Sequence, residues 1–153
     1  MRKNSINHIL LAEDDKDHAF IFECILKKVD ASKRLSVVND GDELFLFLLK
    51  ENPDIIFLDL KMPCKTGFEC LDEMKKNSAY SKIPVIVYSS SAQLSDIEES
   101  YIHKADFYMV KPFSAKHLEQ ALESIFTMDW HAGSPLNQHY YISNRFVPFI
   151  PVG

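Results

Sequence analysis

The sequence predicts a doubly wound α/β fold, with a parallel sheet between two layers of helices. Four short apolar segments, at residues 8–12, 54–58, 83–88 and 106–110, have the length of buried parallel strands, and helix-length segments separate them. A less apolar strand is expected at about residues 35–39. Strands that alternate with helices favour right-handed crossovers, which place helices on both faces of the sheet.

The segments between and after the strands carry apolar residues at helical spacing. Capping residues and turns mark where several of these helices begin and end. The expected helices are residues 16–29 after the cap Asp15, residues 43–50 after a turn at 40–42, residues 66–77, residues 93–103, and a last helix that begins after the cap Ser114.

The composition is that of a soluble globular protein, with 46% hydrophobic and 25% charged residues in a chain of 153. No apolar segment is long enough to span a bilayer, and the amino terminus has no signal-peptide pattern. The net charge of −5 and the absence of a Lys/Arg block argue against a general nucleic-acid surface. Three scattered cysteines without metal-binding spacing favour reduced thiols in a cytoplasm.

Each of the four apolar segments ends on a chemically capable polar residue. Residues 13–15 are Glu, Asp and Asp, and the other segments are followed by Asp59, by Ser89 and by Lys111. Because the carboxyl ends of parallel strands meet at one edge of an open sheet, these groups are expected to share one crevice. Carboxylates, a hydroxyl and a lysine together suit a metal ion and a phosphoryl group.

Asp59 is the candidate nucleophile, since a carboxylate can attack phosphorus and form an acyl phosphate. Glu13, Asp14 and Asp59 offer oxygen ligands of the kind that Mg²⁺ prefers. Lys111 would supply a positive charge and Ser89 a hydroxyl to the phosphoryl group.

Together these segments resemble the receiver domain of two-component response regulators, the fold of the chemotaxis response regulator. The combination of an early acidic cluster, an Asp-x-x-x-Pro motif and a later Lys-Pro-Phe motif is specific. The resemblance implies a flavodoxin-like fold with a five-stranded parallel sheet in the order 2-1-3-4-5 and five helices. It covers about residues 6–127, with matches at residues 9–15, 54–63, Gly67, 84–89 and 105–113.

The resemblance also implies the roles of the site residues. Asp59 would be the phosphoacceptor, and Ser89 and Tyr108 would be the hydroxyl and the aromatic of a switch. Lys111 would pair with the phosphoryl group, and its peptide bond to Pro112 would be cis. The implied metal ligands are Asp14 as the main ligand, Glu13 acting largely through water, Asp59, and the backbone carbonyl of Lys61.

The expected function is that of a single-domain response regulator. It would accept a phosphoryl group from a sensor histidine kinase or a histidine phosphotransfer protein, with Mg²⁺ as cofactor, and would assist its own phosphotransfer and autodephosphorylation without being an enzyme. It would then signal to an unknown downstream protein through the face formed by the fourth helix, fifth strand and fifth helix. A cytoplasmic protein with neither nucleic acid nor membrane as a partner is expected.

Two other functions fit the sequence less well. A phosphohydrolase with an aspartate nucleophile would carry an acidic residue two positions later, where this chain has Lys61. A flavin- or nucleotide-binding domain would need a glycine- or hydroxyl-rich loop after the first strand, where this chain has residues 13–15, all acidic. The six histidines are expected to be surface or packing residues, and Cys64 a spectator near the phosphoacceptor.

The sequence divides into a receiver domain at residues 1–128 and an apolar extension at residues 129–153. A break is expected at residues 133–135, and the prolines that follow prevent a long helix. We expect the extension to contact a second copy and form a homodimer, the alternative being that it folds back over its own domain. The second helix and the face of the fourth helix, fifth strand and fifth helix are the candidate receiving surfaces. The apolar residues are Tyr140, Tyr141, Ile142, Phe146, Val147, Phe149 and Ile150.

Overall fold

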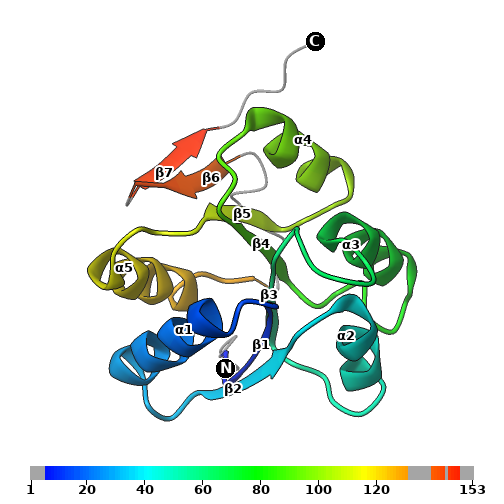
Figure 1. The fold of residues 1–153 in the computed structure, drawn as a ribbon, viewed down its shortest axis with the longest axis horizontal. Helices are drawn as coiled ribbons and strands as arrows, with labels where there is room; N and C mark the ends of the chain where they lie inside the picture. The colour runs from blue at the N-terminus through cyan, green and yellow to red at the C-terminus, as the bar shows by residue number, and fades with distance from the viewer. Residues whose placement is uncertain (1–5, 131–138, 144, 149–153) are drawn as a thin grey trace.

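A seven-stranded sheet organises the chain in the computed structural model, which describes residues 6–130, 139–143 and 145–148 (Figure 1). No helix in this described part is long and apolar enough to cross a membrane. The strands are β1 (His8–Ala12), β2 (Arg34–Val38), β3 (Ile55–Leu58), β4 (Val85–Ser89), β5 (Phe107–Val110), β6 (His139–Ile142) and β7 (Arg145–Pro148). The helices are α1 (Lys16–Val29), α2 (Gly41–Leu48), α3 (Gly67–Lys76), α4 (Leu94–Ile102) and α5 (Ala115–Phe126).

The strand order is β2-β1-β3-β4-β5-β6-β7, and the first five strands are all parallel. The predicted order 2-1-3-4-5 is therefore confirmed, and two further strands extend the sheet beyond β5. The strands and helices lie close to their predicted positions. The largest shift is at α2, which begins two residues before the predicted start because the Asp40 side chain caps it by accepting a hydrogen bond from the amide of Glu43.

Two apolar cores lie on opposite faces of the sheet. Along β1, Ile9 and Leu11 point to the face covered by α1 and α5, whereas Leu10 and Ala12 point to the face covered by α2, α3 and α4 (Figure 1). Strands buried on both faces must be apolar at every position, which explains the continuous apolar runs in the sequence.

The helices begin where polar side chains satisfy their first amides. Asp15 accepts from the amides of Asp17 and His18, and Ser114 accepts from the amide of His117, so both predicted caps are confirmed. The α1 cap matters for the site, since it places the first turn of α1 directly after the acidic residues 13–15.

The described part of the carboxyl-terminal extension forms a hairpin on the same sheet. β6 pairs in parallel with β5, where Tyr140 lies opposite Tyr108 and Tyr141 opposite Met109. β7 pairs in antiparallel fashion with β6. Ser143, in the connection between β6 and β7, has a left-handed φ of 51°. The extension therefore covers the edge that β5 would otherwise expose.

Aromatic packing holds the hairpin and the segment leading to it against the domain. The ring of Phe107 lies 6.2 Å from that of Trp130 and 5.7 Å from that of Phe146. The Trp130 indole donates a 2.9 Å hydrogen bond to the carbonyl of Ile125, and the Tyr101 hydroxyl donates to the carbonyl of His139, which ties α4 to β6. Through these contacts, Trp130 and Phe146 pack against their own chain.

The described part of the extension thus folds back on its own domain, which is the alternative to the expected contact with a second copy. It does so on the predicted face of the fourth helix, fifth strand and fifth helix, and not on the second helix. Backbone pairing with β5 explains this choice, because the edge of a sheet offers unpaired amides and carbonyls that a helix surface lacks. The predicted break at 133–135 and the apolar residues Phe149 and Ile150 lie outside the described residues, and the homodimer stays a prediction.

Candidate functional site

The sheet brings together the residues that follow β1, β3, β4 and β5. The amide of Asp59 donates a 3.1 Å hydrogen bond to the carbonyl of Ala12, so the end of β3 is joined to the end of β1. The amide of Lys111 donates a 2.7 Å hydrogen bond to the carbonyl of Ser89, so the end of β5 is joined to the end of β4. Because the strands are parallel, these backbone contacts bring the residues after the strands to one edge of the sheet, where the crevice was predicted.

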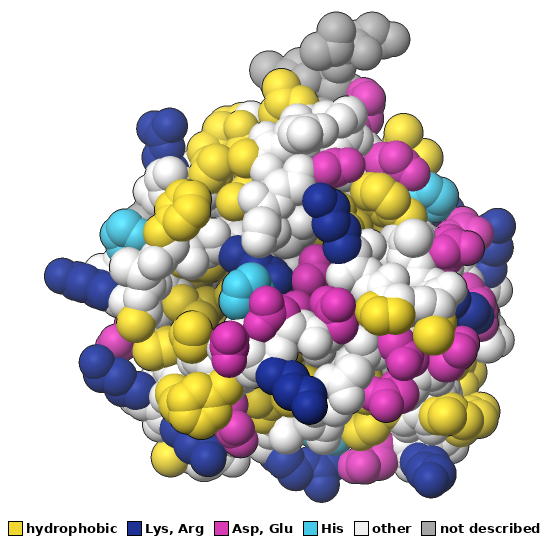
Figure 2. All heavy atoms as spheres, viewed as in Figure 1, with side chains coloured by type: hydrophobic (Ala, Val, Ile, Leu, Met, Phe, Trp, Pro, Cys, Tyr) yellow, Lys and Arg dark blue, Asp and Glu magenta, His cyan; other side chains and the backbone are white. Residues whose placement is uncertain are grey.

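A hollow of about 770 Å³ lies at this edge of the sheet. Figure 2 shows acidic side chains gathered near the middle of this face of the molecule, with a histidine and Lys or Arg side chains beside them. The residues that line the hollow are Glu13, Asp14, Asp15, His18, Asp59, Lys61, Ser89, Ser90, Ser91, Ala92, Gln93, Asp96 and Lys111.

Lys111 joins the two buried carboxylates of the hollow. Its Nζ donates to Oε1 of Glu13 at 2.5 Å and to Oδ2 of Asp59 at 3.1 Å. The three side chains are largely enclosed, with exposed fractions of 10% for Lys111, 1% for Glu13 and 10% for Asp59. In such surroundings an ion pair is only weakly screened by water, so the lysine strongly offsets the repulsion between the two acids.

Burial raises the pKa of Glu13 above its ordinary value. The hydrogen bond from Lys111 lowers that pKa and the nearby Asp59 raises it, but the loss of hydration is the largest cause. The site therefore favours any cation that can compensate its negative charge.

Three carboxylates of the hollow are close enough to share a metal ion. One oxygen of each of Glu13, Asp14 and Asp59 lies within 4.8 Å of the other two. A set made only of oxygen donors matches the preference of Mg²⁺ or Mn²⁺. The Lys61 side chain is exposed, and the Lys61 amide donates to Oδ1 of Asp59 at 3.3 Å, which steadies the loop that follows β3.

Gly67 holds this loop close to the next helix. Its amide donates a 2.9 Å hydrogen bond to the carbonyl of Leu60, and a Cβ at this position would press against the carbonyl oxygen of Asp59 and lie 2.7 Å from Cα of Leu60. Thr66 and Glu69 form a capping box at the start of α3. A side chain at position 67 would therefore displace the backbone of Asp59 and Leu60.

The two candidate switch residues meet through Ser91. The Ser89 hydroxyl accepts a 3.1 Å hydrogen bond from the Ser91 amide, and the Tyr108 hydroxyl donates a 2.8 Å hydrogen bond to the Ser91 carbonyl. Both side chains are buried, and burial raises the pKa of the Tyr108 hydroxyl. One loop residue thus contacts both candidates, a role that the sequence did not suggest for Ser91.

One detail differs from the expectations. The described residues include no cis peptide bond, so the Lys111–Pro112 bond is trans and the expected cis bond was wrong. An X–Pro bond favours trans by only about 0.5–1 kcal/mol, so the resemblance alone could not decide between the two forms.

His18 is exposed, as expected of a surface residue, and it also lines the hollow and contacts Lys111. The sequence signal for its place near the hollow was its position in the first turn of α1, three residues after the cap Asp15.

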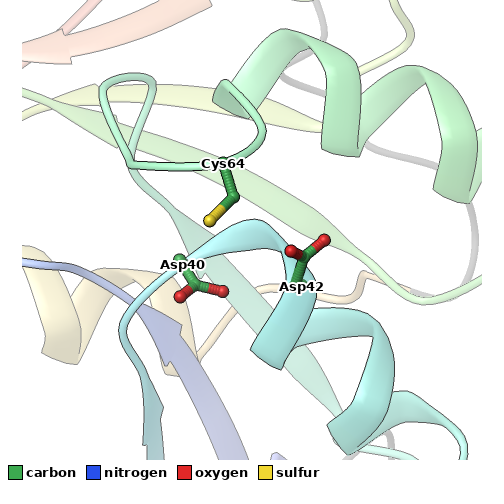
Figure 3. Close-up of side chains that lie close together, drawn as sticks. All are labelled: Asp40, Asp42 and Cys64. Atoms are coloured by element: carbon green, nitrogen blue, oxygen red, sulfur yellow. The ribbon is translucent and has the colours of Figure 1, made fainter.

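A second group of potential metal ligands lies outside the hollow. Asp40, Asp42 and Cys64 approach one another between the start of α2 and the loop before α3 (Figure 3). The Asp40 carboxylate is already engaged as the cap of α2. Loss of hydration and the two nearby carboxylates raise the pKa of the exposed Cys64 thiol, which favours its less reactive protonated form.

Comparison with known proteins gives the family. The model for the response regulator receiver domain matches residues 9–123. The response regulator Rcp1 of Synechocystis sp. is 32% identical over 124 residues, which cover 76% of this chain and 84% of that protein. The phosphorylated cyanobacterial phytochrome response regulator RcpA has a similar crystal structure, with 31% identity, a TM-score of 0.71 and coverage of 79% of this chain and 91% of that chain.

The crystal structure of the Mn(2+)-bound form of Rcp1 is also similar, with 30% identity, a TM-score of 0.70 and coverage of 82% of this chain and 94% of that chain. The chain belongs to the response regulator receiver domain family.

Proposed function

We propose that this chain is a single-domain response regulator that accepts a phosphoryl group on Asp59, with Mg²⁺ as cofactor. The observation that carries the proposal is the enclosed contact of Lys111 with Asp59 and Glu13, at 3.1 and 2.5 Å, beside a third carboxylate from Asp14. This arrangement pairs a nucleophilic carboxylate with a fixed positive charge, as transfer of a phosphoryl group requires. The phosphorylated state of the similar RcpA supports the proposal.

The donor would be a phosphohistidine of a sensor histidine kinase or a histidine phosphotransfer protein. An oxygen of Asp59 attacks phosphorus, and the bond from phosphorus to the donor nitrogen breaks. The nitrogen keeps the electron pair of that bond and takes up a proton. Lys111 then exchanges its contact with the free carboxylate for one with an oxygen of the phosphoryl group, and its charge opposes the developing negative charge.

Glu13, Asp14 and Asp59 would hold the metal ion, together with the carbonyl of Lys61. When bound, a divalent cation neutralises charge on the phosphoryl oxygens. The crystal structure of Rcp1 in its Mn(2+)-bound form supports a divalent cation as the cofactor. Asp14 is exposed, whereas Glu13 and Asp59 are buried, which suits Asp14 as the ligand at the solvent side.

We propose that Ser89 and Tyr108 carry the signal away from the site. A turn of the Ser89 side chain towards a phosphoryl oxygen would alter its contact with the Ser91 amide. Because the Ser91 carbonyl also anchors the Tyr108 hydroxyl, movement of this loop changes the position that Tyr108 favours. Phosphorylation would then shift the equilibrium between two conformations. The free energy of that shift equals the difference between the interaction free energies of the phosphoryl group with the two conformations.

The output would be contact with a downstream protein in the cytoplasm, and not with nucleic acid or a membrane. Because the hairpin covers the edge of β5, a partner that approaches the face of α4, β5 and α5 would meet β6 and β7 together with α4. On α4, Leu94 and Ile102 are exposed to 52% and 68%, which gives this surface an apolar component. A second copy of the chain is one such partner, and would give the predicted homodimer.

The test is incubation of the full chain with Mg²⁺ and a small phosphodonor, followed by intact-mass measurement. The wild-type protein should gain one phosphoryl group, and the Asp59→Asn variant should gain none. Asp54→Asn is the matched control, because Asp54 precedes the same strand at its other end and its carboxylate accepts hydrogen bonds from the backbone amides of Asn7 and His8. Equal labelling of Asp59→Asn and wild type would refute the assignment of the phosphoacceptor.

A further inference from the structure

His18 lies in the hollow without a role in the proposed phosphoryl transfer. It belongs to the first turn of α1, and its side chain is 45% exposed. Its Nδ1 lies 3.2 Å from Nζ of Lys111 and 3.9 Å from Oε1 of Glu13. The imidazole therefore stands on the solvent side of the lysine that the phosphoryl group must meet.

The ammonium group of Lys111 has three N–H donors and no acceptor. Its three neighbours are Oε1 of Glu13 at 2.5 Å, Oδ2 of Asp59 at 3.1 Å and Nδ1 of His18 at 3.2 Å. Because a lysine can only donate, Nδ1 must act as the acceptor, which places the ring proton on Nε2. That nitrogen faces Oδ2 of Asp15 at 3.9 Å.

The three acceptors differ in what happens to them during transfer. Asp59 becomes an acyl phosphate, and Glu13 is one of the proposed metal ligands, so both change their bonding. His18 alone keeps its lone pair directed at Lys111 throughout. The ring of Tyr88, whose centroid is 5.5 Å from Nζ, borders the lysine as well but offers no hydrogen-bond acceptor in that contact.

We propose that His18 is a positioning residue, which acts through Lys111 and holds its ammonium group within reach of the phosphoryl group on Asp59. This inference rests on the proposed function of the site. Without the His18 acceptor, the flexible lysine is drawn to the buried carboxylate of Glu13, its shortest contact, and away from the reacting oxygens. The rate of Asp59 phosphorylation should then fall, by roughly three- to tenfold for one lost hydrogen bond to a charged group at a half-exposed site.

The test compares His18→Leu, His18→Asn and His18→Gln in the full chain, with Mg²⁺ and a small phosphodonor. Leucine has a similar size but no acceptor. The oxygen of asparagine stands as many bonds from Cα as Nδ1 does, whereas that of glutamine stands as far as Nε2. His18→Leu and His18→Gln should be slowed, and His18→Asn should keep a rate near that of the wild type. Equal rates for leucine and wild type, or an asparagine variant as slow as leucine, would overturn the inference.

A second measurement does not depend on phosphorylation. The ¹⁵N-detected signal of the Lys111 ammonium group should be slowed in its exchange with solvent in the wild type and in His18→Asn, and should broaden in His18→Leu. The absence of that difference would also overturn the role of His18. If the wild-type protein gained no phosphoryl group on Asp59 while the ammonium signals differed as expected, the proposed function would fail and the positioning of Lys111 by His18 would stand.

Discussion

Replacement of Lys111 by methionine should show how much the repulsion between the carboxylates of Glu13 and Asp59 lowers the free energy of unfolding. The change keeps most of the side-chain volume and removes the positive charge. In the part of the chain that the structure describes, Lys111 is the cation that donates hydrogen bonds to both Glu13 and Asp59. Both carboxylates are almost fully enclosed. Removing one partner of a buried ion pair lowers the free energy of unfolding by about 3–5 kcal/mol, and we take the lower value here because the hollow opens to solvent.

The assay is urea unfolding at neutral pH without divalent cations. With a slope of about 2 kcal/mol per molar urea, a loss of about 3 kcal/mol lowers the midpoint by about 1.5 M. Addition of millimolar Mg²⁺ should raise the midpoint of Lys111→Met by more than that of the wild type, because the ion no longer competes with the ammonium group and compensates two unpaired acids.

The loss of unfolding free energy in Lys111→Met should also depend on pH, through the protonation of Glu13. Folding raises the pKa of Glu13, chiefly by burial, so protonation of this group favours the folded state. Without the hydrogen bond from Lys111 the pKa rises further. The variant should therefore recover stability relative to the wild type as the pH falls from neutral towards the ordinary glutamate value of 4.5, and should lose it again as the pH rises.

Lys75→Met is the matched control. Lys75 is as enclosed as Lys111 and pairs with Asp106 at 3.0 Å, far from the hollow, so its loss should also destabilise the fold. Mg²⁺ should raise the urea midpoint of Lys75→Met only by as much as it raises that of the wild type. A Lys111→Met midpoint within about 0.3 M of the wild type, well inside the shift worked out above, or an equal gain from Mg²⁺ in both variants, would refute the reasoning.

Three further outcomes are expected. Gly67→Ala should lower the free energy of unfolding by about 1–3 kcal/mol and slow the proposed phosphorylation of Asp59, because the added methyl group displaces the backbone of Asp59 and Leu60. Urea unfolding and intact-mass measurement check these two effects. Ser89→Ala should still accept a phosphoryl group but lose the phosphorylation-dependent change in hydrogen exchange of the loop after β4; an unchanged response would place the coupling elsewhere. Removal of residues 129–153 should lower the free energy of unfolding by at least about 3 kcal/mol, because Trp130 and Tyr141 are buried, and light scattering of the same pair of proteins tests the homodimer.

Local and short-range patterns explain why much of the fold and site was predictable. The strands are apolar at successive positions because both of their faces are buried, and this signal is present in the sequence itself. The caps at Asp15 and Ser114 act on amides only two or three residues away. Once the strands were known to be parallel, their carboxyl ends had to meet, which brought Asp59 and Lys111 together.

The tertiary structure alone decided where the extension lies. Its apolar residues indicated that it would be covered, but several surfaces could have covered it. Pairing of β6 with β5 depends on a free sheet edge, and the ring contacts of Phe107 with Trp130 and Phe146 join residues far apart in the chain. Composition does not encode which of several apolar surfaces an extension meets, since the hydrophobic effect is not directional.

The contacts of single side chains within the hollow also required the tertiary structure. His18 meets Lys111 across 93 positions of the sequence, and Ser91 meets Tyr108 across 17. No spacing pattern in the sequence indicates that His18 contacts Lys111 or that Ser91 contacts Tyr108. The residue types at the ends of the strands, by contrast, did indicate the chemistry of the hollow. The sequence by itself thus determined which groups gather at the sheet edge, because strand direction places them there. Only the packed structure decided which of those groups share a hydrogen bond, because that depends on distances of a few tenths of an ångström between elements remote in the chain.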